Sequence, residues 1–479
     1  MRFVTVIALA FLLLTHLSGC GLMGEVDQRA RYGLILEEHG PVIQIAVMGN
    51  YSDEKKPYLD IHTGIRVNSL IYASEEGRHT ASASLNYYVY KLEDDEYTRV
   101  VTRDTSFVVN EEDYDIREQF EFRFIRHQIP VEPGTWKVEV LATDDRSNES
   151  NRTSKTVEIP SPDAVDLLLT QVKLRGIGRP DSDEQLSSSY DIPSRMDTLE
   201  FSYQLLRGNN PDPVDVSMKL IELESDMEPA RSMAGPPARW GSIAYQGIRF
   251  DEKTIVERQI RTIEDETELI DIKFRIPVPD RGSYRFEASV HPKDDPDSSP
   301  LMKKVRDFGI MSPNHPNVKS IREMAEPLVY LMSRSRYNKM MQIEDNDSLK
   351  TVIDQFWIDV GGDARTAQRL IEKYYDRVEE ANRQFTNHKA GWKTDMGMIY
   401  VLFGEPNFFD QRMNRIQWYY GSDMFAPDAG FSFESAHGSR VVRNLSLTHY
   451  ILLRHRNYSR LEFRQVQHWL SGNILDYPI

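Results

Sequence analysis

Thr394, Asp395 and His388 are the residues whose types and spacing come nearest to a catalytic group in this 479-residue sequence. His388 lies six residues before Thr394, so a hydroxyl, a carboxylate and an imidazole share one short stretch. Catalysis there would also need an oxyanion donor and a cleft. The sequence contains no Gly-x-Ser-x-Gly elbow, no His-Glu-x-x-His pair and no phosphate-binding glycine loop to support such a site.

The stretch AGWKTDMGMIYVLFGEP (390–406) also has a complete structural interpretation. Gly391 allows a tight turn after a helix, and Trp392 can bury a large apolar surface. Thr394 and Asp395 are residue types that bond backbone amides in turns. We therefore expect structural roles for this pair and assign no catalytic residue.

Polar side chains on the helix expected before this stretch form a second group. Arg377 and Asn382 are expected to meet Asp395 and Glu405 once the helix folds back, together with Arg383. One interpretation is a partly buried network of ion pairs and amide bonds that fixes the packing of the helix on the turn. The other is a polar groove for a ligand.

The sequence suggests two kinds of ligand site, one for a glycan or peptide and one for Ca²⁺. A glycan or peptide groove would use Trp392 and Trp418 as stacking platforms beside a carboxylate. A Ca²⁺ site would use the carboxylate clusters at 293–300 and 344–348, but neither has the glycine and distal glutamate of an EF-hand loop. The 12 histidines are scattered without a ligand-type pair. We expect solvated turns, no metal and no cofactor.

The C-terminal segment differs in charge from the rest. Between Arg440 and Arg464 there are six arginines against one acidic residue, Glu462. In an acidic protein this asymmetry indicates either contacts with acidic parts of the same chain or binding of a polyanion or partner.

Length and charge set the broad class. A chain of this length is too long for one core and indicates about three domains. The net charge of −16 argues against nucleic acid as a partner, because a phosphate backbone repels an acidic surface. The single cysteine means that no disulfide forms within the chain, so stability must come from core size.

The N-terminus predicts export and lipid attachment. Arg2 precedes an apolar run of signal-peptide length, and Leu-Ser-Gly-Cys ending at Cys20 resembles the lipobox of bacterial lipoproteins. The resemblance implies a signal peptide at 1–19, acylation of Cys20 with palmitate-type chains, and a tether at 20–40. Gly21 in place of aspartate implies the outer membrane. More than one acyl chain anchors a protein stably.

Two strand-rich blocks follow, at 41–160 and 164–311. Runs such as FEFRF alternate with period two between polar turns. The expected strands are 42–47, 65–72, 84–92, 118–126 and 135–143, then 166–174, 197–206, 214–223, 269–276, 282–290 and 303–310. The pieces PVEPGTWKVEVLAT and PVPDRGSYRFEASV share one layout, which favours two tandem immunoglobulin-like β-sandwiches. Residues 225–247 are expected to form an insertion loop.

The third block, 318–479, is predicted to be an α+β domain. Apolar residues at helical spacing predict a helix over 349–360, capped by Asp347 or Ser348 and stopped by Gly361-Gly362. A longer helix runs from Asp363 to Phe385, and a shorter one from 333 to 343. The expected strands are 398–403, 415–420 and 441–453.

Residues 391–395, Gly-Trp-Lys-Thr-Asp, match the signature of the GWxTD domain, a family of bacterial envelope proteins. QFWIDVGGD, YYDRVEEANRQF, MIYVLFGEPN and QWYY resemble further segments of that family, so the resemblance covers about 320–450. It singles out Gly391, Trp392, Thr394, Asp395, Gly404 and Pro406. The family commonly has Arg-Gly-Arg after the aspartate, whereas this chain has Met396-Gly397-Met398. The family has no established activity to carry over.

These observations favour a non-enzymatic lipoprotein of the bacterial cell envelope. The first hypothesis is a scaffold or partner-binding subunit, anchored to the membrane by lipid and bound to an envelope protein. The second is a carbohydrate- or peptidoglycan-binding protein. The third is an enzyme whose site is the turn Trp392–Asp395.

Overall fold

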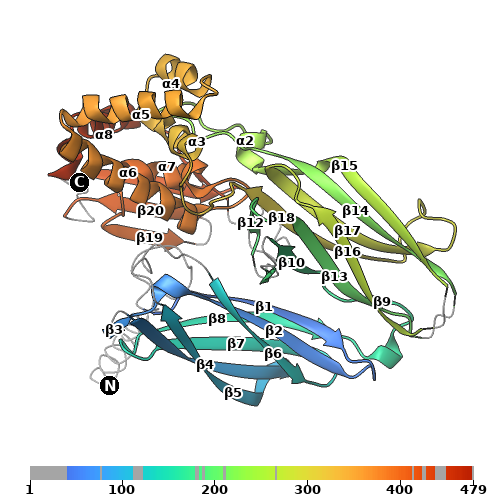
Figure 1. Cartoon of the computed structure of the whole chain (residues 1–479). Coiled ribbons are helices and arrows are strands. Elements are labelled where there is room, and N and C mark those ends of the chain that lie inside the picture. The colour runs from blue at the N-terminus through green and yellow to red at the C-terminus, as the bar shows by residue number, and fades with distance from the viewer. Residues whose placement is uncertain are drawn as a thin grey trace, which may run out of the picture. The chain divides into compact units, whose positions relative to one another are not determined.

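The computed structural model describes residues 40–479 apart from 76–77, 112–121, 179–182, 186–188, 209–211, 265–266, 413–414, 423–427, 437–448 and 477–479. The expected signal peptide, Cys20, Arg440 and Arg443 lie outside the described residues. The protein is mostly β-sheet, and its helices are concentrated in the C-terminal part (Figure 1). No helix in the described residues is long and apolar enough to cross a membrane.

The first block folds into two sheets around one core. One sheet has the order β1-β2-β6, and the other has the order β3-β4-β7-β8 with β5 paired to β4, all antiparallel. Alternating burial along β4 and β7 places every second side chain in the core. The strands are β1 (Ile43–Tyr51), β2 (Pro57–Arg66), β3 (Ala73–Glu75), β4 (Arg78–Glu93), β5 (Glu96–Glu111), β6 (Phe122–Pro130), β7 (Gly134–Asp144) and β8 (Ser150–Ile159).

The second block is also sandwich-like. Its sheets have the orders β11-β10-β13-β16, with β9 paired to β13, and β12-β18-β17-β14-β15. Stacked Phe201 and Phe286, with ring centroids 4.1 Å apart, join the two sheets in the core. The strands are β9 (Leu168–Leu169), β10 (Lys173–Ile177), β11 (Asp183–Gln185), β12 (Asp191–Pro193), β13 (Thr198–Leu206), β14 (Val214–Ser225), β15 (Ile248–Ile263), β16 (Leu269–Pro277), β17 (Gly282–Pro292) and β18 (Met302–Met311).

The expected insertion loop lies between β14 and β15. Residues 226–242 have no regular secondary structure, and the short helix α2 (Ile243–Gln246) leads into β15. We call residues 226–234 the strap, because they run from the second sandwich onto the C-terminal domain.

Helices and a four-stranded antiparallel sheet, β19-β20-β21-β22, form the C-terminal part. Its elements are α3 (Ile321–Ala325), α4 (Arg334–Met341), α5 (Asn346–Gly361), α6 (Ala364–Phe385), α7 (Asp395–Phe403), β19 (Phe408–Arg412), β20 (Arg415–Tyr420), β21 (Ala429–Ser435), β22 (Tyr450–Leu452) and α8 (Tyr458–Leu470). Asp363 caps α6 as expected, and Gly362 ends α5 in the left-handed conformation. The cap of α5 is Asp345, not Asp347 or Ser348, and it accepts a hydrogen bond from the Ser348 amide.

Three strand predictions are wrong in whole or in part. The strand expected at 166–174 is divided into β9 and β10, with no strand at 170–172. Residues 398–403 belong to helix α7, whose residues are all buried. A helix buried on every side has no apolar periodicity, so a short apolar run does not distinguish it from a buried strand. In 65–72, strand β2 ends at Arg66 and a 3₁₀ turn follows at Val67–Ser69.

Candidate functional site

The GWxTD turn is a 3₁₀ turn, Gly391–Lys393, followed by the start of α7. Thr394 is the N-cap of that helix. Its Oγ1 accepts a hydrogen bond from the Gly397 amide at 3.0 Å and donates one to the Gly391 carbonyl at 2.7 Å. The hydroxyl hydrogen is therefore committed to a backbone carbonyl, in a cap that satisfies a free helix amide.

Both glycines of the turn are required by close backbone approach. A Cβ on Gly391 would lie 1.8 Å from the Ala381 carbonyl oxygen in α6. A Cβ on Gly397 would lie 1.9 Å from the Gly391 carbonyl oxygen. The turn is thus wedged between the long helix and the helix that it starts.

Trp392 fixes the turn to its surroundings. Its side chain is 4% exposed, and its ring meets Tyr330 edge to face with centroids 5.8 Å apart. The Tyr330 hydroxyl donates to the Trp392 carbonyl at 2.8 Å, and Asn382 Oδ1 accepts from the Trp392 amide. Asn382 also donates to the Pro316 carbonyl, so this amide joins α6, the turn and the linker before α3.

Asp395 forms a buried ion pair with Arg454. The two guanidinium nitrogens Nη1 and Nη2 donate to the carboxylate at 2.8 and 2.6 Å, and the Leu452 amide donates to Oδ2 at 2.7 Å. The side chains of Asp395 and Arg454 are only 9% and 3% exposed. A bidentate arginine–carboxylate pair of this kind is strong and geometrically specific.

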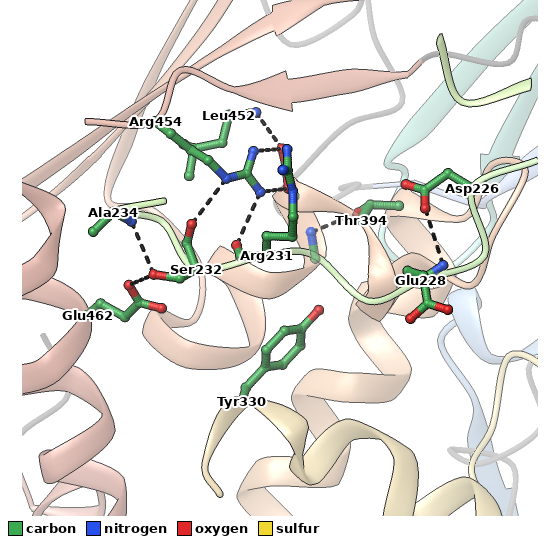
Figure 2. A network of polar contacts seen from close by, with 12 residues as sticks. Asp226, Glu228, Arg231, Ser232, Ala234, Tyr330, Thr394, Leu452, Arg454 and Glu462 are labelled. Atoms are coloured by element: carbon green, nitrogen blue, oxygen red, sulfur yellow. Dashed lines mark hydrogen bonds and ion pairs between the residues drawn. The ribbon is translucent and has the colours of Figure 1, made fainter. Parts of the chain in front are cut away.

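Arg454 also holds the strap. Figure 2 shows its guanidinium between Leu452 and the strap residues Arg231 and Ser232. Nε donates to the Ser232 carbonyl and Nη2 to the Arg231 carbonyl, each at 3.1 Å. The Ser232 hydroxyl in turn donates to Glu462 at 2.6 Å.

Lys389, which precedes the turn and is 4% exposed, holds the start of the strap. Its Nζ donates to the Asp226 carboxylate at 2.7 Å and to the Glu228 carbonyl at 2.8 Å. Met233, near the other end of the strap, is fully buried. The C-terminal domain therefore contacts the strap along its length, mostly through main-chain carbonyls.

Arg377 completes the far end of α7. Its Nη1 donates to the Val401 and Leu402 carbonyls at 3.3 and 3.0 Å, and burial lowers its pKa to about 10. Gly404 has φ +87°, and a Cβ there would lie 2.6 Å from this guanidinium. Pro406 is buried, whereas Glu405 is exposed.

The expected polar network forms differently from the prediction. Asp395 is paired with Arg454 rather than with Arg377 or Asn382. Arg377 bonds carbonyls near the C-terminal end of α7, and Asn382 bonds the Trp392 amide and the Pro316 carbonyl. Arg383 pairs with Glu380 on its own helix at 2.7 Å. These contacts favour the interpretation of a network that fixes packing.

Trp392 and Trp418 do not serve as stacking platforms. Trp418 is fully buried and packs against Phe385 and Phe433, with ring centroids 5.5 and 4.9 Å apart. The prediction of a glycan groove at these two tryptophans is therefore wrong. Exposed tryptophans and buried ones have the same sequence signal, and only the fold distinguishes them.

His388 does not meet Thr394 in the way that a catalytic base would. It is 2% exposed, and its ring contacts that of His449 edge to face, with centroids 4.9 Å apart. Burial, the neighbouring His449 and Lys389 hold the pKa of His388 well below its usual value. With Thr394 and Asp395 both engaged in structural bonds, these three side chains form no nucleophile–base pair here.

The sequence does not indicate the roles of Tyr330 and Lys389, and it predicts the strap only as part of a loop, without its contacts. The excess of arginines near the C-terminus predicts intramolecular contacts as one alternative, and Arg454 is one of these arginines. Its contact with Asp395, 59 residues away, depends on β22 lying beside α7. In the described residues no cluster of three metal-ligating side chains occurs.

Comparisons with solved structures give similarity without close correspondence. The chain is similar to a red sea bream transglutaminase (10% identity, 61% of this chain, 34% of that chain, TM-score 0.19). It is also similar to an E. coli alpha-2-macroglobulin (9% identity, 57% of this chain, 16% of that chain, TM-score 0.18). A third is the C-terminal domain of the Streptococcus pyogenes protein AspA (7% identity, 56% of this chain, 99% of that chain, TM-score 0.17).

The chain thus spans only 34% and 16% of the first two proteins, and scores this low carry no information about activity. No curated protein matches the sequence. A family model does match, over residues 297–471, which include the buried turn, its partner Arg454 and all the C-terminal helices. The description of that family is the GWxTD domain, and the chain is a GWxTD domain-containing protein.

Proposed function

We propose that this protein is a non-enzymatic scaffold of the bacterial cell envelope, in which the GWxTD domain is a docking module. The observation that carries the proposal is the set of hydrogen bonds that Arg454 and Lys389 donate to main-chain carbonyls of the strap. The polar groups at the GWxTD turn form hydrogen bonds and ion pairs that hold this segment and cap the start of α7. They give the C-terminal domain a fixed attachment to the sandwich before it.

A fixed attachment suits a scaffold. A domain joined to its neighbour only by a linker reorients freely, whereas one that grips an extended segment presents a constant surface to a partner. The ion pair that orients Arg454 is buried, so salt screens it little. Three main-chain carbonyls of the strap accept hydrogen bonds from Arg454 and Lys389, and the side chains of Asp226 and Met233 add an ion pair and a buried apolar contact.

The remaining parts of the proposal concern location and reach. Lipid on Cys20 anchors the protein in the outer membrane, and residues up to about 40 act as a tether. The two sandwiches, with immunoglobulin-like strand order, serve as spacers that carry the GWxTD domain to an envelope protein. Antiparallel sheets packed face to face suit this role, since they give reach without chemistry.

The experiment is in-cell crosslinking of wild type, Cys20→Ser and Met233→Asp, with Pro237→Asp as the matched control. Met233 is the buried strap residue and Pro237 is exposed in the same loop. Wild type and Pro237→Asp should crosslink to the same defined envelope protein. Met233→Asp should lose that product because a buried charge releases the strap.

Two results would contradict the proposal. If Cys20→Ser fractionated with membranes as fully as wild type, lipid on Cys20 would not be the anchor of the protein. If crosslinking recovered polysaccharide but no protein, and Met233→Asp gave the same result as wild type, the protein would bind glycans rather than act as a scaffold.

A further inference from the structure

A large cleft lies between the two sandwiches, away from the GWxTD turn. Its volume is about 870 Å³, within the range of about 300–1,000 Å³ that ligand pockets occupy. One wall is formed by strands β1, β2 and β6 of the first sandwich. The other is formed by β10, β13 and β16 of the second. Most lining residues belong to these strands, and Ser52, Asp53 and Lys56 belong to the turn between β1 and β2.

Direct contacts between the sandwiches hold the walls in place. The Tyr51 amide donates to the Gln204 side chain at 2.8 Å, and the same side chain donates back to the Tyr51 carbonyl at 2.9 Å. Leu168 and Leu206 of the second sandwich belong to the buried core of the first. The cleft is therefore preformed, which lowers the entropy lost when a ligand binds.

Buried carboxylates orient the cations of the cleft. Asp60 is fully buried and binds Arg126 through two hydrogen bonds of 2.6 and 2.7 Å and Lys173, from the other sandwich, at 2.7 Å. Burial raises the pKa of Asp60, but His62, Arg126 and Lys173 outweigh it and hold that pKa well below its usual value.

A second buried carboxylate repeats this arrangement. Glu200 is 4% exposed and binds Arg175 at 2.8 Å and Arg275 at 2.7 Å. Each of the two carboxylates therefore holds two cationic side chains, so each group keeps a net positive charge. The side chains of Arg126 and Arg275 are 51% and 63% exposed, so part of this charge faces solvent.

The lining as a whole is cationic in a protein of opposite sign. It carries five lysine or arginine side chains, including Lys56 and Lys273, against three acidic ones. The chain has a net charge of −16. A concentration of positive charge in a concave site of an acidic protein attracts an anionic ligand.

The uncharged lining narrows the class of that ligand. Tyr58 is partly exposed, and Gln128 and Ser202 add an amide and a hydroxyl. Of the apolar lining residues, Leu174 and Ile272 are buried, whereas Pro57 and Pro130 are at least partly exposed. Hydroxyl-rich rings fit such a surface, because an aromatic face and side-chain hydrogen bonds both suit sugars.

We propose that this cleft binds an oligosaccharide that carries carboxylate groups. Arg126, Lys173 and Arg175 meet the acidic substituents, and Tyr58 packs against a sugar ring. The proposal goes beyond the scaffold role and involves none of the residues of the GWxTD turn.

The test is isothermal titration calorimetry of the full-length protein in detergent with two probes. A hyaluronan hexasaccharide carries a carboxylate on alternate sugars, and chitohexaose is neutral. We expect saturable binding of the hyaluronan probe that weakens as ionic strength rises, and much weaker binding of chitohexaose. A Lys56→Gln/Lys273→Gln variant should bind the hyaluronan probe about fivefold more weakly, since each exposed charge contributes modestly.

The matched control is Lys155→Gln/Lys319→Gln, which removes two exposed lysines that do not line the cleft. It should bind like wild type. Neither cleft lysine touches Asp60 or Glu200, so both variants should melt like wild type by circular dichroism. Equal weakening in the two variants, equal affinity for chitohexaose, or no saturable binding of the hyaluronan probe would each overturn the proposal.

Discussion

The two junctions of this chain are built around the same pair of residue types, with opposite results. Between the sandwiches, Asp60 binds Arg126, whose side chain is 51% exposed in a cleft. Between the second sandwich and the GWxTD domain, Asp395 binds Arg454, whose side chain is 3% exposed. The first arginine still faces solvent, whereas the second has its remaining donors on strap carbonyls. A buried carboxylate therefore orients an exposed arginine in an open cleft at one junction. At the other junction it orients a buried arginine that holds two domains together.

The largest expected effect is that of Asp395→Asn. The substitution keeps the size of the side chain but leaves Arg454 buried without its counter-charge, which costs about 3–5 kcal/mol. Four of the six tryptophans lie in the C-terminal domain, so tryptophan fluorescence during urea unfolding reports chiefly on that domain. The unfolding midpoint of the variant should fall sharply.

The control for that substitution is Arg415→Gln. Arg415 and Glu434 form an exposed pair 3.8 Å apart, worth about 0–1 kcal/mol. If both variants lowered the midpoint equally, the closed junction would owe nothing to its buried pair, and the contrast with the cleft would fail.

Asp60→Asn should cost less, about 1–3 kcal/mol, because water can still reach Arg126 when the carboxylate is gone. The pKa of Asp60 is lowered in the folded state. Its contribution is therefore present above the usual aspartate pKa of about 4 and is lost as pH falls below that value. Amide hydrogen exchange along β2 and β6 should be faster in the variant at neutral pH, and this difference should shrink steadily as pH falls below about 4. A difference that stays as large in acid as at neutral pH would contradict this assignment.

Several local features near the closed junction could be predicted from the sequence alone. Local signals predicted the start of α6 at Asp363, the stop of α5 at Gly361-Gly362 and the loop at 225–247, since caps, glycines and polar runs act over a few residues. They failed for 398–403 because a helix buried on all sides and a buried strand share one composition. Tertiary packing decides between them.

Most of the site needed contacts between distant parts of the chain. Thr394 was expected to bond a backbone amide, and it does so with Gly397. Asp395 bonds the Leu452 amide and Arg454, and Arg454 bonds residues more than 200 positions away. No local pattern encodes such a pairing. The cleft was missed for the same reason, because Asp60 and Lys173 become neighbours only through the packing of two domains.

A smaller and pH-dependent effect is expected at the edge of the closed junction. Burial lowers the pKa of His449 to about 4 and that of His388 well below its usual value, with Lys389 opposing protonation and Asp395 and Asp226 near His449 favouring it. The folded state thus prefers neutral rings, so stability is full above about pH 6.5 and declines as pH falls toward 4. A His388→Gln/His449→Gln variant should have a flatter stability profile over that range. A variant profile as steep as that of wild type would contradict this assignment.

The smallest expected effect is that of Ser232→Ala, and it tests how the strap is recognised. The variant loses the exposed hydrogen bond to Glu462 but keeps the carbonyl that Arg454 binds. The loss should be below about 1 kcal/mol in the unfolding of the C-terminal domain. A loss of unfolding free energy close to that of Asp395→Asn would mean that the domain recognises the strap through the serine side chain. The strap would then be a sequence-specific ligand, whereas a small cost means that any extended segment able to follow the same path satisfies Arg454.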